Sequence, residues 1–376
     1  MIVAGGTYRE RCVAPRADLL FGSGGRAALA LRDLEPTTLH TFHPNPEEVR
    51  ISFGPDAVVH ESSAVLAFDY LHPLAHPRVS PDPHPWCGLT PVAGDRVIRF
   101  GCLEGEFVVS AEVAVYDPQS GSCPRFGANG SRAGRLALVL NAGEARAMAG
   151  TPGLVEAGRT LRRTEDAEAV VVKDGPSGAL VFESDTPPTR VPAHWTPRLF
   201  KIGSGDVFTA AFAHHWATRG CSAAQAAALA SRHVAVYVAN RTLPCRPDPD
   251  AGPPVHGRLD GATVVLAVDA RGVASDWLRH EAGQALFGLG ASRVEAAEKG
   301  RAADVMLALV AGPADRALEL AVGTAARGAP CVAYTEDANA AGTLREAGAV
   351  VMDDFAASVY ATAWILDGRA ALLRRD

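Results

Sequence analysis

Short runs of apolar and β-branched residues recur along the first two thirds of the chain, with turns or helical stretches between them. Four such runs lie at residues 96–100, 108–116, 136–141 and 169–173. Runs this short and this apolar are typical of strands in a parallel sheet that helices cover on both faces. The segment at 142–148 has helical spacing. The pattern therefore predicts an α/β fold.

The same alternation begins again after residue 260, on a smaller scale. Strand-like and helical runs take turns at 263–268, 274–289, 304–310, 314–327, 330–334, 350–352 and 355–373. This order predicts a small doubly wound, flavodoxin-like sheet. The stretch before it, at 240–255, holds five prolines and little apolar content, which is typical of a stiff connector. We expect two domains, residues 1–243 and 261–376, with a proline-rich linker at 244–260.

The composition is that of a soluble globular protein, and it argues against several classes of function. Apolar residues make up 48% of the 376 residues and charged residues 21%, with a formal net charge of −6. The chain has no long basic run, so we expect no nucleic-acid partner. It also lacks a signal-peptide pattern and the ~18 uninterrupted apolar residues of a membrane span. The seven cysteines form no C-x-x-C pair, which fits a reducing cytoplasm.

The most informative motif lies at residues 199–217. The turn Gly203-Ser204-Gly205 is followed by Asp206 and an apolar run with helical spacing, so the turn amides would lie at a helix N-terminus. Unpaired amides and the helix dipole bind anions there, and glycine lets a phosphate approach the backbone closely. Asp206 could then take a proton from a hydroxyl that attacks the phosphate. The plain alternative is that Asp206 only caps the helix.

Two other segments carry candidate ligand contacts. Gly24 and Gly25 enter an alanine- and leucine-rich helix, so their amides would also face a ligand. Asn141 and Glu144 follow a strand at the edge where open α/β sheets bind ligands, and their oxygens suit Mg²⁺. The alternative for this pair is a helix cap with Glu144 in the capping-box position.

The stretch at 169–182 predicts a strand, a tight turn and a returning strand. Lys173 ends the first strand, and Gly175 and Gly178 shape the turn. An ordinary hairpin would account for the same pattern.

Taken in order, these segments resemble the ribokinase-like (PfkB) family of carbohydrate and nucleoside kinases over residues 1–243. The resemblance implies a ribokinase-like parallel sheet with a small lid, and ATP and Mg²⁺ as cofactors. It gives Asp206 the role of catalytic base and makes Gly203, Ser204 and Gly205 the anion hole. On the nucleotide side, the resemblance implies contacts from Asn141, Glu144, Lys173, Gly175 and Gly178, with Glu144 holding Mg²⁺ through water. On the substrate side, it implies contacts from Glu10, Gly24 and Gly25.

The chain departs from the family pattern at three positions. Ser204 replaces an alanine, Phe200 replaces a residue that is often acidic or polar, and Leu29 replaces a frequent asparagine. Between residues 35 and 100 the chain is rich in proline and histidine and has no regular periodicity, which favours extended loop over a metal site. The family's lid and substrate loops fall in that region, so the sequence does not name the acceptor.

The segment 261–376 resembles the nucleoside 2-deoxyribosyltransferase-like family through features such as Trp277 and Glu281 on the first helix. The resemblance makes Glu319 the candidate nucleophile at the anomeric carbon, with Asp269 or Asp304 beside it. The Gly-Thr that precedes the family's glutamate is absent here, and a shift of one residue would turn the side chain by about 100°. A solvated helix carboxylate is the alternative, and we expect nucleoside or nucleotide binding with weak or no glycosidic cleavage.

The sequence therefore predicts ATP-dependent phosphorylation of a sugar or nucleoside hydroxyl by a homo-oligomer. One alternative is a non-catalytic protein that senses a nucleotide on a kinase fold. Another is a deoxyribosyltransferase or N-glycosidase that acts through Glu319.

Overall fold

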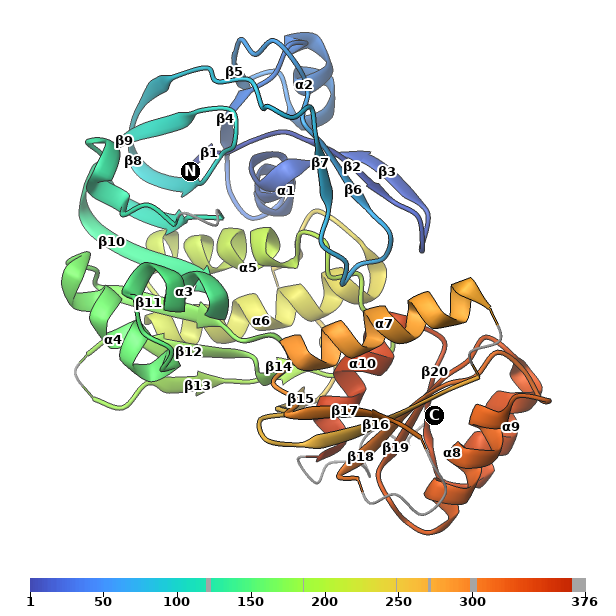
Figure 1. Cartoon of the computed structure of the whole chain (residues 1–376). Helices are drawn as coiled ribbons and strands as arrows, with labels where there is room; N and C mark the ends of the chain where they lie inside the picture. Colours follow the sequence, from blue (N-terminus) through green and yellow to red (C-terminus); the bar gives the residue numbers. More distant parts are fainter. Residues whose placement is uncertain (120–122, 185, 248, 270–271, 298–302, 367–376) are drawn as a thin grey trace.

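The computed structural model of the chain describes residues 1–119, 123–184, 186–247, 249–269, 272–297 and 303–366. Figure 1 shows a large sheet with helices on both faces and, toward the C-terminus, a smaller sheet with its own helices. No helix among these residues is long and apolar enough to cross a membrane. The prediction of a mixed α/β fold is confirmed.

The large sheet has nine strands in the order β13-β12-β11-β10-β9-β8-β1-β4-β5. Seven neighbouring strands pair in parallel, in the order β11-β10-β9-β8-β1-β4-β5. At the other end of the sheet, β12 pairs antiparallel with both β11 and β13. In chain order the strands are β1 (Ile2–Ala4), β4 (Thr38–Phe42), β5 (Val58–His60), β8 (Leu89–Phe100), β9 (Glu106–Asp117), β10 (Arg132–Asn141), β11 (Ala169–Lys173), β12 (Ala179–Phe182) and β13 (Thr189–Val191).

Alternate residues of these strands point to two separate apolar layers. Val139 and Val171 pack with helices α1 (Gly22–Leu31), α5 (Ser204–Ala213) and α6 (Ala223–Asn240). Their neighbours Leu138 and Val170 face helices α3 (Ala142–Ala149) and α4 (Leu154–Thr164) on the other side. The two-residue period of a strand thus explains why these runs are apolar throughout. Helix α2 (Pro46–Phe53) follows β4 at the edge of the sheet.

The region between residues 35 and 100, where the sequence favours extended loop, contains regular structure. It contributes two strands to a four-stranded sheet of order β3-β2-β6-β7, which we call the small sheet. Its strands are β2 (Arg9–Cys12), β3 (Ala17–Leu20), β6 (Ala67–Tyr70) and β7 (Arg78–Ser80). Strands of three or four residues leave no periodicity to detect, and the pairing of β2 with β6, which joins the two halves of the small sheet, links segments far apart in the sequence.

The predicted linker does not cross open solvent in this structure. Strand β15 (Pro254–Val255) pairs with β14 (Ala193–His194), and the Cys245 amide donates to the Ala30 carbonyl. Cys245, Val255 and Leu259 are buried. The segment is therefore fastened along the larger half of the molecule.

The C-terminal sheet is parallel throughout, with the order β17-β16-β18-β19-β20 of a doubly wound fold. Helices α8 and α9 cover one face, while α7 and α10 pack on the other in the same apolar cluster as α5 and α6. The elements are β16 (Thr263–Val268), α7 (Val273–Gly288), β17 (Arg293–Ala296), β18 (Val305–Leu309), α8 (Arg316–Ala326), β19 (Cys331–Tyr334), α9 (Ala338–Glu346), β20 (Val350–Met352) and α10 (Phe355–Trp364). The predicted last helix extends to residue 373, and its part after 366 lies outside the described residues.

Candidate active site

Helix α5 begins at the predicted anion-binding turn. Gly203 precedes the helix with φ of +73°, which an L side chain adopts only with strain, and Asp206 lies in the first turn. The Ser204 amide donates to the Lys201 carbonyl at 3.0 Å. Among the hydrogen bonds of the described residues, none has the amide of Gly203 or Gly205 as donor. Two of the three turn amides thus stay available for an anion at the positive end of the helix.

The side chain of Asp206 is buried and ion-paired. Its Oδ2 accepts from Nη1 of Arg26 at 2.8 Å, and its Oδ1 accepts from Nε2 of Gln119 at 2.5 Å. Each carboxylate oxygen has two lone-pair directions, so the group can still accept a hydrogen bond from a hydroxyl. Asp206 is therefore fixed in place without being saturated.

Arg26 is the centre of a buried network that sequence reasoning missed. Its guanidinium donates to both carboxylate oxygens of Glu10, and its Nε donates to the Tyr237 hydroxyl at 3.0 Å. It also lies over the Phe21 ring, 4.9 Å from the centroid. One charged residue among the small and apolar residues of α1 is the only signal in the sequence. One buried cation thus joins the two carboxylates that the sequence assigns to substrate and base, Glu10 and Asp206.

Gly24 and Gly25 pack against neighbouring segments of the chain. A side chain on Gly24 would overlap the Gly5 backbone, and one on Gly25 would meet the Phe53 ring. The Gly24 amide also donates to the Gly6 carbonyl at 3.0 Å. Gly24 thus lets α1 approach the end of β1 closely, and Gly25 leaves room for Phe53 of α2. The Gly24 amide is already paired within the protein, whereas the expected ligand contact of Gly25 stays a prediction.

A second pair of charged side chains, from the strands on either side of β10, lies close to the anion-binding turn. Asp117 and Lys173 end β9 and β11, on either side of β10, and their side chains meet at 2.7 Å. Thr209 on α5 donates to the same Asp117 oxygen at 2.7 Å. A side chain on Gly205 would come within 3.4 Å of Nζ of Lys173, so this ammonium lies beside the anion-binding turn.

The electrostatics of this group follow from burial and charge. Burial raises the pKa of Asp117, and Lys173 opposes that change. Burial also raises the pKa of Glu144, with a further contribution from Asp117. Burial disfavours the charged form of Lys173, but Asp117 and Glu144 outweigh it and raise its pKa. The arrangement keeps a cation in a water-poor position where a phosphate would be bound strongly.

The sequence does not decide whether Asn141 and Glu144 form a capping box or a ligand contact, and in the structure they form a capping box. The Glu144 amide donates to the Asn141 side chain at 2.9 Å, and the Asn141 amide donates to Oε2 of Glu144 at 2.8 Å. Both residues line the same cavity as Lys173. The local helix cap therefore holds Glu144 at the cavity, and the two readings of this motif are compatible.

The oxygens present fit a hard divalent cation. The Oδ1 atom of Asp117 is buried and has no hydrogen-bond partner among the described residues, and Glu144 keeps one oxygen outside its capping box. The described residues contain no group of three or more His, Cys, Asp or Glu placed to hold a metal directly. A Mg²⁺ ion here would need water and phosphate oxygens to complete its shell.

A cavity of about 1100 Å³ connects these residues. The turn of Gly203, Ser204 and Gly205 lines it, together with Gly175 and Gly178 from the turn after β11. Both of the latter have positive φ, and a side chain on Gly178 would overlap the Val191 carbonyl. Tyr70, at the end of the small sheet, lines the cavity too. The predicted nucleotide-side residues are thus brought together around one space.

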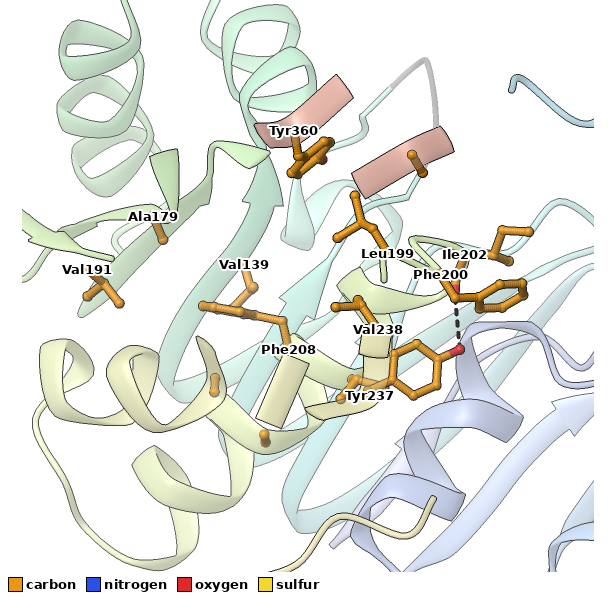
Figure 2. Close-up of a cluster of buried hydrophobic side chains, with 14 of the residues drawn as sticks. Val139, Ala179, Val191, Leu199, Phe200, Ile202, Phe208, Tyr237, Val238 and Tyr360 are labelled. Atoms are coloured by element: carbon orange, nitrogen blue, oxygen red, sulfur yellow. Dashed lines mark hydrogen bonds between the residues drawn. The ribbon is translucent and has the colours of Figure 1, made fainter. Parts of the chain in front are cut away.

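Phe200, one of the departures from the family pattern, has a structural role. It is buried beneath the Arg241 guanidinium, which lies 5.2 Å from its ring centroid. Figure 2 shows it beside Ile202 and Tyr237, whose hydroxyl donates to the Ile202 carbonyl. An apolar residue here supports the segment that leads into the anion-binding turn.

The candidates in the C-terminal sheet are not gathered in one place. Glu319 is exposed in the first turn of α8, which follows the C-terminal end of β18. Asp269 follows the C-terminal end of β16, whereas Asp304 precedes β18 and accepts from the Thr263 amide at 2.7 Å. Because β16 and β18 are parallel, Asp304 lies at the opposite edge of the sheet, and it cannot assist at Glu319 as predicted.

A protein-family model and several solved structures match part of this chain. Residues 136–249 match the family described as pfkB family carbohydrate kinase. A solved pyrophosphate-dependent kinase in the ribokinase family, complexed with a pyrophosphate analog and myo-inositol, is 17% identical over 65% of this chain and 97% of its own, with a TM-score of 0.47. Ribokinase of Arabidopsis thaliana, complexed with ribose and ATP, is 16% identical over 65% and 95%, with a TM-score of 0.47.

Phosphofructokinase-2 of Escherichia coli, in complex with potassium, is 14% identical over 65% of this chain and 95% of its own, with a TM-score of 0.46. No curated protein matches the sequence. The family match covers most of β10, all of β11, the glycine turn after it and all of α5. It supports a PfkB carbohydrate kinase domain in that part of the chain.

Proposed function

We propose that this protein transfers the terminal phosphoryl group of ATP to a hydroxyl of a sugar or nucleoside. One observation carries the proposal: a part-buried ammonium and free turn amides line one end of a cavity, and a fixed carboxylate lies in the first turn of the helix that begins there. Lys173 supplies the ammonium, Gly203 and Gly205 the amides, and Asp206, which accepts a hydrogen bond from the cavity residue Gln119, the carboxylate. Phosphoryl transfer depends mainly on positioning and on stabilising charge, and this set of groups supplies both.

Each group has a distinct part in the reaction. Asp206 accepts the proton of the attacking hydroxyl, while Arg26 and Gln119 hold its carboxylate in one orientation. The amides of Gly203 and Gly205 bind the oxygens that gain negative charge, at the N-terminus of α5. Lys173 neutralises charge on the donor phosphates. The small sheet, with Tyr70 at the cavity, acts as a lid that keeps water out.

Glu144 and Asp117 are the residues that would hold Mg²⁺ beside the phosphates. When bound, the ion neutralises charge on the donor. Glu144 is kept in place by its capping box, and Asp117 by Lys173 and Thr209. The protein's own part is thus to fix two oxygens near the anion-binding turn.

The experiment that tests the function is a panel of acceptors. Full-length protein, ATP and Mg²⁺ are incubated with single sugars and nucleosides, and the formation of ADP is followed for each. We expect turnover with at least one acceptor and only background hydrolysis without one. The absence of acceptor-dependent ADP formation across the panel would contradict the proposal.

A second candidate function rests on the Arg26 network. Arg26 pairs with both Glu10 and Asp206, so the two acidic groups on the acceptor side are already neutralised in this structure. A nucleotide-sensing protein on a kinase fold would tolerate such an arrangement. Tight ADP or ATP binding, without ATP consumption over the same panel, would favour it.

For the C-terminal part we propose a flavodoxin-like, nucleoside 2-deoxyribosyltransferase-like domain at 261–376, after a kinase domain at 1–243 and a segment at 244–260. The strand order supports this division. Glu319 is exposed and far from Asp304, so we propose that this domain does not cleave glycosidic bonds. Base release from nucleosides by the full-length protein, abolished by Glu319→Gln, would contradict that view.

A further inference from the structure

The cavity does not end within the larger half of the molecule. Its far end is lined by Leu289, Tyr360 and Trp364 of the C-terminal domain and by Arg258 of the segment before that domain. The near end holds the anion-binding turn described above. A ligand that filled the whole cavity would therefore touch the anion-binding turn and the C-terminal domain at once.

The C-terminal domain, through Trp364, and the connecting segment, through Gly257 and Arg258, are fastened to the turn that follows β11. Nε1 of Trp364 donates to the Pro176 carbonyl at 3.0 Å, and the Ser177 hydroxyl donates to the Gly257 carbonyl at 2.8 Å. Arg258 forms an ion pair with Asp174 at 3.2 Å. These contacts hold the far wall of the cavity in a fixed position relative to Gly175 and Gly178.

Tyr360 has the chemistry of a ligand contact at this wall. It is 94% buried, since only 6% of its surface is exposed, and its ring packs edge-on against Trp364 with centroids 5.8 Å apart. Figure 2 shows it in the same buried cluster as Leu199 and Val238. A side chain on Gly175 would lie 3.3 Å from its hydroxyl oxygen. None of the hydrogen bonds among the described residues includes that hydroxyl.

The hydroxyl oxygen is not one of the fully buried polar atoms without a partner, which means that it can be reached from the cavity. A polar atom of a bound molecule can therefore pair with it in place of water. Beside it, Leu289 offers an apolar surface, 3.9 Å from a side chain built on Gly175. An aromatic ring with one polar atom and an aliphatic neighbour suits a flat heterocycle with polar edges.

We propose that the nucleoside end of the phosphoryl donor binds between the 174–178 turn and the C-terminal domain, where the Tyr360 hydroxyl hydrogen-bonds to it. This inference rests on the proposed kinase function, and it makes the C-terminal domain part of the donor site. Tyr360 and Leu289 then determine whether the donor is a nucleotide, while the phosphates remain with Lys173 and the glycine turn.

The test compares two ligands that share phosphates and differ in the nucleoside. Binding of ADP and of inorganic tripolyphosphate to full-length protein is measured by calorimetry for the wild type and for Tyr360→Phe. The matched control is Tyr334→Phe, which removes a hydroxyl of the same domain that lies outside the cavity and donates to Glu336 at 2.6 Å. Both substitutions keep the aromatic ring, so the fold is preserved.

We expect Tyr360→Phe to weaken ADP binding about fivefold, as the loss of one hydrogen bond does, and to leave tripolyphosphate binding unchanged. Tyr334→Phe should change neither. Unchanged ADP binding in Tyr360→Phe would overturn the inference, and so would an equal loss for tripolyphosphate. If the wild type binds no ADP, the inference fails, although transfer from an inorganic polyphosphate to a sugar would preserve the kinase chemistry. If ADP binding behaves as expected and no donor is consumed, the proposed function fails and the inference stands.

Discussion

The guanidinium of Arg26 and the carboxylate of Asp206 form a buried ion pair at 2.8 Å, although 180 positions separate them in the chain. The pair connects α1 and α5, which pack together in the same apolar layer on one face of the sheet. It also links the candidate base to Glu10 on the small sheet through the same cation. Substitutions in this network should therefore change both stability and catalysis.

Replacing Arg26 by methionine should lower the free energy of unfolding by about 3–5 kcal/mol, because two buried carboxylates lose their counter-charge. The measurement is urea unfolding at neutral pH. Arg135→Met is the matched control, since Arg135 pairs with Glu168 at 2.7 Å with both side chains about half exposed, and such pairs contribute about 1 kcal/mol or less. Equal losses in the two variants would contradict a special role for the buried pair.

Replacing Asp206 by asparagine tests the base directly. Asparagine keeps the shape and one acceptor oxygen but cannot take the proton, so kcat should fall by about 10²- to 10⁴-fold, while KM for ATP changes little. Steady-state kinetics on the acceptor found in the panel give both values. Glu168→Gln, an exposed carboxylate outside the cavity, serves as the control and should keep full activity. Normal turnover in Asp206→Asn would remove the proposed role.

The main strands could be predicted because their signal is local. The runs at 136–141 and 169–173 match β10 and β11 closely, and both strands are buried on two faces. The small sheet could not be predicted in the same way. Tyr70 ends a strand of four residues that pairs on one side with β7 and on the other with β2, which lies far back in the chain.

Site residues could be predicted from the sequence where a single segment contains the whole motif. They could not be predicted where folding brings residues from distant segments together. Asn141 and Glu144 interact within one helical turn, so their capping box could be foreseen. Arg26 and Gln119 meet Asp206 only in the folded molecule, and nothing near them in the sequence indicates it. Buried charge pairing is a property of the tertiary structure.

Gly203 and Gly220 have nearly the same φ, so substitutions at the two positions can distinguish backbone strain from overlap of the new side chain with its neighbours. Gly203 has φ of +73° and Gly220 has φ of +69°. A side chain at 203 would overlap the Arg26 guanidinium, whereas one at 220 meets nothing within 4 Å. Gly220→Ala should therefore cost only the strain of a left-handed residue, about 1–2 kcal/mol, and keep its activity.

Gly203→Ala should carry the same strain and also displace Arg26 from Asp206, so we expect about a 100-fold loss of kcat as well. Urea unfolding and steady-state kinetics on both variants check this. If Gly203→Ala retained the turnover of Gly220→Ala, the contact between Gly203 and Arg26 would not matter for catalysis.

The last prediction concerns Glu104, which accepts from the Tyr8 hydroxyl at 2.7 Å and is almost fully buried. Burial raises the pKa of Glu104 from its ordinary 4.5 to about 7. A carboxyl whose pKa is higher in the folded state binds its proton more tightly there. Its contribution to stability is therefore complete below about pH 4.5 and is lost as the pH rises through 7, by up to about 3 kcal/mol.

Glu104→Gln removes the ionisation and keeps an acceptor for Tyr8. Relative to the wild type, the variant should gain stability between pH 5 and pH 8, measured as the difference in urea unfolding free energy at each pH. Glu168→Gln is the control, because Arg135 lowers the pKa of Glu168 below its ordinary 4.5 and the stabilisation by its carboxylate is complete above about that pH. The stability difference between Glu168→Gln and the wild type should therefore stay constant between pH 5 and pH 8. A difference between Glu104→Gln and the wild type that is the same at both pH values would show that Glu104 does not titrate in this range.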